Sequence, residues 1–377
     1  MRIAFIGQKG LDIGERGGGV EQHAAALASG LAERGNEVVV YARSRYRSAE
    51  PLARAGIRVR YLPTIYRKNL EAIVHAWLST LDAMCRRYDI IHYHGVGPAT
   101  LAWLPRWFKP QCKVIVTFHS QDRFHRKWGR LAKAYLHFGE LAACWFPNAT
   151  IAVSHVLQVY CRDHYRRQVI FIPNGAYVTH VPATDQLPQF GLEPGKYIVN
   201  VSRLIPHKGQ HYLIEAWQMI QKQYPEKLKD IKLALVGAPS YTYDYERQLK
   251  DLAAGNRNII FPGYQAGEAL KQLFAHAYLY VHPSEAEGLP VVVLEAMSYG
   301  RPVLVSDIPE NLEAMHHAGF SFKNKDSVDL SVKLLQLLNH PELVAEAARR
   351  VQDVVETEFN WSVIAEQTEA VYRSVRH

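Results

Sequence analysis

The chain has 377 residues, of which 48% are hydrophobic and 21% are charged. This length exceeds what one ordinary core accommodates, so two domains are expected, and the composition excludes a disordered or fibrous protein. No apolar run approaches the ~20 residues that a membrane-spanning helix needs. The opening MRIAFIGQKG is typical of a first β-strand rather than a signal peptide. We therefore expect a cytoplasmic protein, in which four scattered cysteines are reduced and structural.

The net charge of +8 is unevenly distributed along the chain. Up to residue 180 there are 25 Lys+Arg against 12 Asp+Glu, whereas the remainder has 19 against 24. A basic first half could favour nucleic acid, an anionic membrane surface or a phosphorylated acceptor. The alternative is an ordinary solvated surface, and composition alone does not separate these interpretations.

Short apolar, β-branched runs alternate with helix-like segments throughout the chain, which predicts parallel sheets with helices on both faces. The runs expected as strands are residues 2–7, 36–42, 57–63, 89–95, 113–119 and 149–154, then 196–202, 231–237, 258–263, 277–284 and 302–307. The pattern predicts two doubly wound, Rossmann-like domains that face each other across a cleft. Ligands of such sheets bind outside the carboxyl ends of the strands.

The domain limits follow from a break in this alternation. The stretch 177–195 is rich in Pro and Gly and has no helical period. We expect a first domain at 1–178, a linker at 179–195, a second domain at 196–358 and a terminal amphipathic helix within 359–377. In that helix Ile364, Thr368 and Val371 share one side.

A glycine-rich segment follows the first expected strand. Gly18 and Gly19 lead directly into a helical pattern, so the backbone there could lie against a phosphate or a sugar ring. The spacing of the glycines is not G-x-G-x-x-G, so a nicotinamide cofactor is not expected. A loop that merely connects a strand to a helix is the alternative.

Two histidine-containing segments follow later strands of the first half. One carries His92 and His94, and the other carries His119, Asp122 and His125. A lone histidine is more often structural than catalytic, and the set lacks a complete group of metal ligands, so no metal is predicted. His119 ends a strand, where a ligand-facing residue belongs. We take His94 and Asp122 as candidates on the acceptor side.

In the second half, basic and acidic residues follow successive strands. Arg203 and Lys208 lie on the loop after the first strand and could clamp a diphosphate, although isolated basic residues are more often surface charge. Further on, SEAEGLPVVVLEAM places Glu287 before an expected helix that begins at Pro290, and Glu295 inside it.

The start of that helix is a candidate phosphate site. The backbone N–H groups around Gly288, Leu289 and Val291 would be unpaired, and two carboxylates would flank them. A nucleotide sugar, with its diphosphate between two hydroxyl-bearing ends, has this layout. The alternative is a helix-capping acid and a solvated helical acid.

The segment PSEAEGLPVVVLEAMSYGRPVLVSD resembles the E-x7-E signature of the retaining GT-B glycosyltransferases of family four. The resemblance implies that Glu287 meets the donor sugar and that Glu295 holds the ribose. Arg203 and Lys208 match the family's R-x4-K-G phosphate loop, and Gly18 and Gly19 match its G-G-x-E element.

Further motifs extend the resemblance over nearly the whole chain. His119 matches the histidine beside the donor sugar, and Tyr264 and Gln265 match the loop at the nucleotide base. The segment HSQDRFHRKWG resembles a subgroup associated with polysaccharide and exopolysaccharide assembly, with Ser120 where glycine is usual.

The resemblance implies a retaining, metal-independent glycosyltransferase that uses a nucleotide-sugar donor and no cofactor, and in which the last helix returns to the first domain. We expect the departing diphosphate to accept the proton of the acceptor (a front-face route), stabilised by Arg203 and Lys208. The other route gives Glu287 the role of nucleophile. Two other classes stay open: a nucleotide-sugar epimerase of the same fold, and a catalytically silent nucleotide- or saccharide-binding protein.

The acceptor is expected to be a saccharide or a lipid-linked saccharide. Trp103, Trp107 and Trp128 stand among basic residues of the first half and could rest on an anionic membrane, at its inner face. The alternative is a soluble enzyme with these tryptophans in its core. No motif supports nucleic-acid binding.

Overall fold

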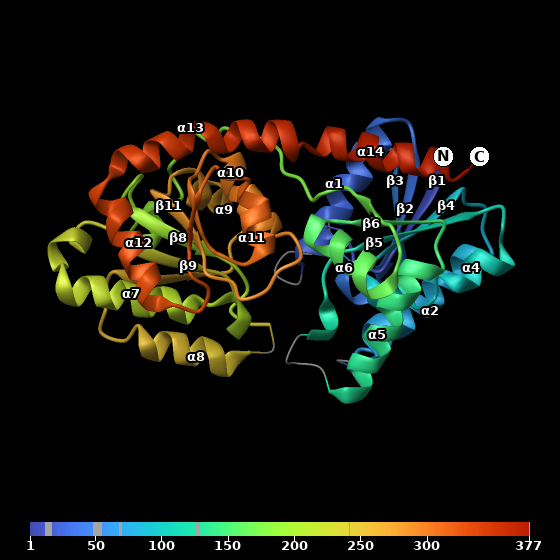
Figure 1. Ribbon diagram of the computed structural model, residues 1–377, viewed down its shortest axis with the longest axis horizontal. Helices are drawn as coiled ribbons and strands as arrows, with labels where there is room; N and C mark the ends of the chain where they lie inside the picture. Colours follow the sequence, from blue (N-terminus) through green and yellow to red (C-terminus); the bar gives the residue numbers. More distant parts are fainter. Residues whose placement is uncertain (12–16, 48–54, 68–69, 125–128, 241, 377) are drawn as a thin grey trace. The chain divides into compact units, whose positions relative to one another are not determined.

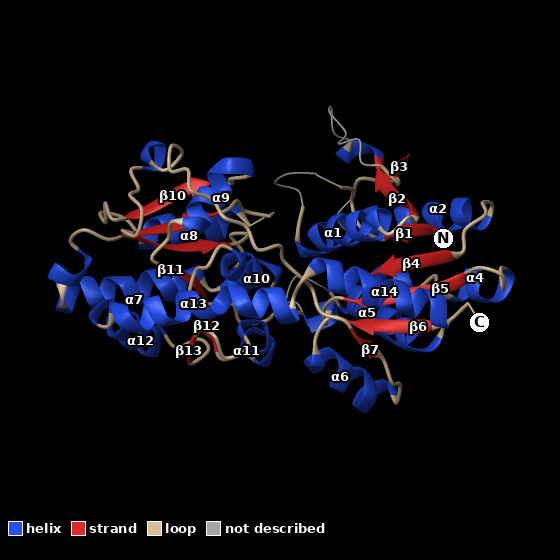
Figure 2. Ribbon diagram, turned by 90° about the horizontal axis from the view of Figure 1, so that it is seen from above, coloured by secondary structure: helices blue, strands red, loops and turns tan. Residues whose placement is uncertain are grey.

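The structure is a computed structural model that describes residues 1–11, 17–47, 55–67, 70–124, 129–240 and 242–376. Its contacts divide the chain into two compact units, one of Met1–Gly175 with Trp361–His377 and one of Ala176–Asn360. Each unit is built on its own parallel sheet, whose strands are coloured red in Figure 2. The expected class, two doubly wound Rossmann-like domains, is confirmed.

The first unit has a seven-stranded sheet in the order β3-β2-β1-β4-β5-β6-β7. Its strands are β1 (Arg2–Ile6), β2 (Glu37–Arg43), β3 (Ile57–Leu62), β4 (Ile90–His94), β5 (Lys113–Phe118), β6 (Ala149–Ala152) and β7 (Ile170–Phe171). Its helices are α1 (Gly19–Glu33), α2 (Glu71–Met84), α3 (Val96–Ala99), α4 (Trp103–Phe108), α5 (Arg130–Trp145), α6 (His155–Tyr165) and α14 (Trp361–Ser374).

Alternation along the strands assigns the helices of the first unit to two faces. On one face Ile90 and Ile115 pack in a core with residues of α1 and α14. On the other face the Tyr93 hydroxyl lies 3.0 Å from the Thr80 hydroxyl of α2. Figure 1 shows α2, α4 and α5 gathered on one side of the strands, with α1 and α14 beside each other on the other side.

The second unit has a six-stranded sheet in the order β10-β9-β8-β11-β12-β13. Its strands are β8 (Tyr197–Val201), β9 (Lys232–Val236), β10 (Ile259–Gly263), β11 (Leu279–His282), β12 (Val303–Ser306) and β13 (Phe320–Phe322). Its helices are α7 (Gln210–Gln223), α8 (Tyr243–Leu252), α9 (Gly267–Ala275), α10 (Val291–Ser298), α11 (Pro309–Met315), α12 (Ser327–Asn339) and α13 (Pro341–Glu358). Trp217 of α7 and Leu334 of α12 are fully buried in its core.

Residues 179–195, expected as a linker, lie in the second unit and are held by it. Leu187 and Leu192 are buried, and the Gly195 amide donates to the carbonyl of His276 at 2.8 Å. The Gln186 amide donates to the Gln272 side chain, also at 2.8 Å. The chain lacks helical period here because these residues wrap a surface through local turns rather than through a helix.

The terminal helix is amphipathic as predicted, and it belongs to the first unit. Ile364, Thr368 and Val371 are buried. Arg34, the residue that follows α1, donates to Glu369 of α14 at 2.7 Å, and Glu369 also accepts from Arg373 and Asn36. These three donors outweigh the effect of burial and lower the pKa of Glu369 to about 2.

A prediction follows from the close approach of α1 and α14. A Cβ on Gly30 would lie 2.7 Å from the Cβ of Ala365, which is closer than two such atoms tolerate. Gly30→Ala should lower the free energy of unfolding by about 1–3 kcal/mol because α14 must move away. Gly97→Ala is the matched control, since a Cβ there meets open space. Urea unfolding followed by circular dichroism measures both, and equal stability of the two variants would contradict the packing described.

Candidate functional site

The carboxyl edge of the second sheet carries the residues that the sequence singled out in the second half. Loops leave β8 and β11, which are neighbours in the sheet, and these loops lie against each other. The amide of Glu285 and the hydroxyl of Ser284 both donate to the carbonyl of His207, at 2.8 and 3.1 Å. Gly209 has a φ of 71°, and a Cβ on it would lie 1.9 Å from the carbonyl oxygen of Pro283. Only glycine allows this approach.

Glu287 lies at the centre of a hydrogen-bonded group on these two loops. Lys208 Nζ donates to Glu287 Oε1, and the same oxygen lies 2.8 Å from His282 Nε2. His282 Nδ1 lies 3.0 Å from the hydroxyl of Tyr280. The neutral imidazole that carries its proton on Nε2 satisfies both contacts, because it donates to the carboxylate and accepts from the tyrosine.

The electrostatics of this group keep Glu287 ionised. Burial alone would raise its pKa, but the charge of Lys208 and the hydrogen bond from His282 hold the pKa well below its ordinary value. Burial lowers the pKa of His282 despite the adjacent carboxylate, so the ring is neutral near pH 7. The result is a fixed, oriented acceptor of hydrogen bonds.

Glu295 is in a contrasting environment, one turn inside α10. Burial raises the pKa of its carboxyl to about 7. Among the described residues none donates a hydrogen bond to this carboxylate or pairs with it. The residue is only partly buried, so water reaches this carboxyl group and hydroxyl groups of a ligand could replace that water.

The start of α10 lies between the two glutamates. The helix begins at Val291 and Pro290 is its N-cap, one residue later than predicted, because ψ of Pro290 is 98° and so extended. The first amides to reach a backbone carbonyl belong to Val293 and Leu294, which donate to Pro290. First-turn amides have no carbonyl partner within the helix, which makes this end suitable for an anion.

The remaining candidates of the second unit lie at the same edge of the sheet. Arg203 is exposed on the loop after β8, and no described residue forms an ion pair or hydrogen bond with its guanidinium. Tyr264 and Gln265 follow β10, and Gln265 Nε2 donates to the carbonyl of Pro262 at 2.7 Å. Lys208 differs from Arg203 because it is half-buried and already paired with Glu287.

In the first unit the glycine segment forms the start of α1. Gly18 is the N-cap in an extended conformation and Gly19 is the first helical residue. Glu21 Oε1 accepts the amide of Lys9 at 3.1 Å, which ties the loop after β1 to the helix. Glu21 therefore has a structural role as an acidic residue in the first turn of α1.

The histidines lie together at the carboxyl edge of the first sheet because their side chains are on the same face of that sheet. His92, His94 and His119 alternate with residues of the opposite face, so all three point towards α1 and α14. His92 is held between the Tyr372 and Thr117 hydroxyls at 2.6 and 2.7 Å and is structural.

His94 and His119 form a cluster with His23 of α1. His119 Nε2 lies 3.4 Å from His94 Nδ1, and His23 Nδ1 lies 2.9 Å from Asn174 Oδ1. Burial lowers the pKa of His23 to about 4 and holds the pKa of the other two well below the usual value. The Nε2 atoms of His23 and His94 are buried without a hydrogen-bond partner among the described residues.

Within the described part of the chain, the geometry of this histidine cluster suits a metal ion. Each of the three imidazoles offers a nitrogen within 4.8 Å of the others, and neutral histidines are the form that binds zinc. The sequence did not predict this set, because His23 lies far from the strand-end histidines in the chain.

Asp122 lies on a short 3-10 helix, Asp122–Phe124, and accepts the Ser120 hydroxyl at 2.8 Å. His125 and Trp128 lie outside the described residues. Serine in place of the usual glycine therefore forms a hydrogen bond of its own within the loop.

His23 and His282 are the residues of these sites that sequence reasoning missed. His23 lies on the buried face of α1, one turn after Gly19. His282 ends the otherwise apolar strand β11 and is fully buried. A polar residue in a buried apolar run is a signal in each case, although its partners become visible only in the fold.

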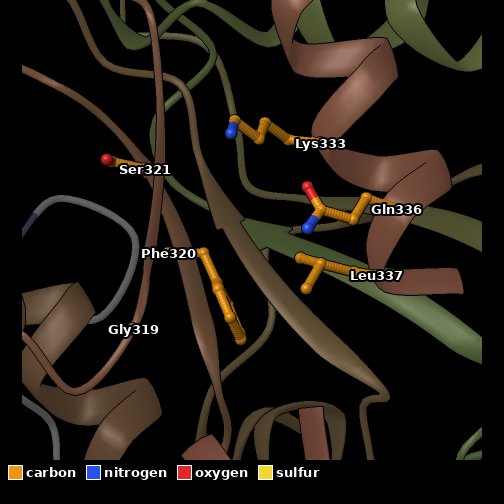
Figure 3. A pocket seen from close by; sticks show the side chains of 6 residues that line it. All are labelled: Gly319, Phe320, Ser321, Lys333, Gln336 and Leu337. Carbon is orange, nitrogen blue, oxygen red and sulfur yellow. The ribbon is translucent and has the colours of Figure 1, made fainter. Parts of the chain in front are cut away.

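A hollow of about 280 Å³ lies elsewhere in the second unit, at the start of β13 and beside α12. It is lined by Gly319, Phe320, Ser321, Lys333, Gln336 and Leu337 (Figure 3). Lys333 is its one ionisable residue, so this hollow lacks the paired carboxylates found at the opposite edge of the sheet.

The raised pKa of Glu295 generates a prediction on stability. The pKa of Glu295 in the folded protein, about 7, exceeds the ordinary value of 4.5. The folded state disfavours the ionised carboxylate, so the protein loses stability as pH rises from about 4.5 through 7. Glu295→Gln should therefore raise the free energy of unfolding by about 1–3 kcal/mol at pH 8 and by less at pH 5.

Thermal unfolding at both pH values measures this effect. Glu285→Gln is the matched control, because the Glu285 carboxylate is paired with Lys325 at 3.1 Å and with the Tyr212 hydroxyl at 3.0 Å, and its replacement should give no gain. An equal effect of Glu295→Gln at both pH values would contradict the assignment.

Relatives of known name resemble this chain along its full length. It is 27% identical over 399 residues to a phosphatidyl-myo-inositol mannosyltransferase of Mycobacterium leprae, covering 100% of this chain and 97% of the relative. It is 24% identical over 375 residues to the phosphatidylinositol N-acetylglucosaminyltransferase gpi3 subunit of Schizosaccharomyces pombe, covering 95% of this chain and 78% of that protein.

Solved structures share the fold at lower identity. Sucrose-phosphate synthase from Thermosynechococcus elongatus superposes with a TM-score of 0.81 at 22% identity, covering 100% of this chain and 99% of the other. Anabaena Alr3699/HepE, in complex with UDP and glucose, gives 0.77 at 20% identity, covering 99% and 100%.

Two family matches divide the chain close to the division between its units. Residues 17–179 match the family described as Glycosyltransferase Family 4, and residues 184–353 match the family described as Glycosyl transferases group 1. The chain is therefore a glycosyltransferase that carries a Family 4 domain followed by a group 1 domain.

Proposed function

We propose that this enzyme transfers a sugar from a nucleotide-sugar donor to an acceptor hydroxyl, with retention of the anomeric configuration and without a required metal. One observation carries the proposal. Glu287 is held ionised by Lys208 and His282, and Glu295 has no partner, on either side of the start of α10. This layout fits a ligand that has hydroxyls at both ends and a diphosphate in its middle.

In this proposal, specific residues bind each part of the donor. Glu287 accepts hydroxyls of the sugar, and Glu295, whose carboxylate has no hydrogen-bond partner among the described residues, accepts the ribose hydroxyls. The first-turn amides of α10 and the unpaired Arg203 bind the diphosphate, together with Lys208. Tyr264 and Gln265 lie at the base. Gly18 and Gly19 contribute backbone to the donor side, and His119 lies beside the sugar.

The front-face route fits these groups better than a covalent route. In it the bond between the sugar and the diphosphate breaks, the acceptor oxygen bonds to the same face of the sugar, and the acceptor's proton passes to the departing diphosphate. Arg203, Lys208 and the dipole of α10 stabilise the charge that develops on the leaving group. The Glu287 carboxylate is already paired with Lys208 and His282, which favours a role in binding a sugar hydroxyl over a role as nucleophile.

The acceptor is proposed to be a saccharide or a lipid-linked saccharide. Two relatives have names that refer to phosphatidylinositol, which favours the lipid-linked form. A part in polysaccharide or exopolysaccharide assembly, and a place at the inner face of the membrane, belong to the same proposal. The described helices include none that is both long and apolar enough to span a bilayer.

The donor test is NMR of the purified protein with UDP-, GDP- and ADP-sugars and no added acceptor. We expect slow release of nucleotide from one of these donors, with the first-formed sugar in the anomeric form of the donor and with the same rate after treatment with EDTA. Conversion of one sugar nucleotide into another would indicate an epimerase instead, and binding without turnover, even with acceptors supplied, would indicate a silent binder.

The EDTA arm also tests the histidine cluster. A rate that falls on chelation, recovers with zinc, and no longer responds to zinc in a His23→Gln variant would place a metal at His23, His94 and His119. That result would overturn the metal-independent part of the proposal while leaving the transferase part standing.

The role of Glu287 gives a second prediction on activity. Glu287→Gln removes a charge that Lys208 and His282 orient, so turnover should fall by about 10²–10³. In the wild-type enzyme incubated with donor, whose Glu287 carboxylate is intact, no glycosyl–enzyme should accumulate, as measured by mass spectrometry of the intact protein. Glu285→Gln is the control for an acid of the same loop and should stay within about tenfold of the wild type. A covalent sugar on the enzyme, or azide rescue of Glu287→Ala with inverted product, would establish the nucleophilic route.

A further inference from the structure

Large apolar side chains cover the outer surface of three helices of the first unit. We call this surface the outer apolar face and define it by Trp77 and Leu81 of α2, Trp107 and Phe108 of α4, and Phe138 and Trp145 of α5, all of which are exposed. Trp107 is 62% exposed and Phe108 is 69% exposed. Contiguous apolar surface of this kind marks an interaction site rather than an ordinary surface.

Helix α2 is amphipathic in the reverse of the usual sense. Its buried positions carry small or polar residues: His75, Ala76, Ser79, Thr80 and Ala83. Its solvent side carries Leu70 just before the helix, then Trp77, Leu78 and Leu81, which follow one stripe at helical spacing. The core of the unit is complete without these side chains, so packing within the unit does not explain them.

Helix α5 repeats the arrangement. A Cβ on Gly139 would lie 2.3 Å from the carbonyl oxygen of Val96, so the close approach of α3 requires glycine at this position of α5. Ala142 and Ala143 are buried beside it. The outer side carries a second stripe, in which Leu131 precedes Phe138 and Trp145 at seven-residue spacing.

Helix α4 joins the two stripes into one surface. Lys109, at its end, donates to the carbonyls of Met84 and Ala83 at 2.9 and 3.1 Å, which fixes α4 to the end of α2. Towards α5, the rings of Trp107 and Phe146 have centroids 5.7 Å apart, and those of Phe146 and Phe138 have centroids 6.5 Å apart. Figure 1 shows α2, α4 and α5 on the same side of the sheet.

The charges around this surface are basic. The carboxylates of these three helices, all of whose residues are described, are engaged: Glu71 with Arg43, Asp82 with Arg60, and the buried Glu140 with Arg123. The exposed charged residues on or next to the helices are Arg87, Arg106, Arg130 and Lys133. An uncompensated basic rim around aromatic side chains attracts an anionic partner.

We propose that the outer apolar face docks on the headgroup layer of an anionic lipid bilayer. Tryptophan and phenylalanine enter the interface between headgroups and acyl chains, while arginine and lysine remain at the level of the lipid phosphates. A second copy of this chain is a poorer occupant, because self-association would place one basic rim against another. Docking would bring a membrane-bound acceptor to the enzyme. That purpose rests on the proposed function, whereas lipid binding itself does not.

The test is flotation of the full-length protein with vesicles of phosphatidylcholine alone and with 30% phosphatidylglycerol (about one lipid in three), at physiological salt. We expect binding to the anionic vesicles to exceed binding to the neutral ones by about tenfold or more, and to weaken as salt is raised. Replacing Trp107 and Phe108 together by serine should reduce binding about tenfold, since both side chains lose their place in the interface.

Two further variants complete the design. Arg106→Glu with Lys133→Glu should reduce binding to the anionic vesicles and leave the weak binding to neutral vesicles unchanged. Tyr243→Ser with Val332→Ser is the matched control, because both side chains are more than half exposed but belong to the second unit, and its binding should equal that of the wild type. Thermal unfolding and acceptor-free donor hydrolysis should stay at the wild-type level in all variants.

Three results would overturn the proposal: no binding of the wild type to anionic vesicles, equal binding by the serine variant, or a wild-type dimer in solution that the serine variant converts to a monomer. The last would assign the outer apolar face to self-association. Because vesicle binding needs neither donor nor acceptor, a failure here is distinct from a failure of the proposed transferase activity.

Discussion

All strands of the two sheets run parallel, and this constraint places the chemistry of the protein. A parallel pair needs a long connection, so every strand delivers its loop to the same edge of the sheet before the chain returns through a helix. In the second unit the loops after β8 and β11 meet in this way, and Lys208 pairs with Glu287 although 79 positions separate them. In the first unit the same rule brings His94 and His119 together from neighbouring strands.

The two glutamates of the second unit have pKa values shifted in opposite directions by their surroundings. Glu287 has a cation and an imidazole beside it, so it is ionised and fixed even without a ligand. Glu295 is partly exposed and has no cation beside it among the described residues, and desolvation by its surroundings raises its pKa to about 7.

The helices of the first unit also differ between their buried and exposed faces. The buried faces of α2 and α5 include small residues, such as Ala76 of α2 and Ala142 of α5, and α3 approaches α5 closely at Gly139. The tryptophans of these helices, Trp77 and Trp145, are exposed instead. The side chain of Trp107 is 62% exposed, which contradicts the alternative that placed it in the core, whereas Trp103 is partly buried and its ring centroid lies 5.6 Å from that of Trp107.

The amino-acid pattern alone predicts the two parallel sheets, the eleven runs expected as strands, the terminal helix and the loops that carry charged residues. These follow from local alternation and from turn residues, which depend on neighbours in the chain. The three-dimensional fold was needed to find the partners of Glu287, the cluster of His23 with two strand-end histidines and the attachment of residues 179–195 to the second unit. It also added β7 and β13, which with two and three residues are too short for an alternating pattern. Contacts between residues far apart in the chain, and the burial that sets a pKa, exist only once the sheets have formed.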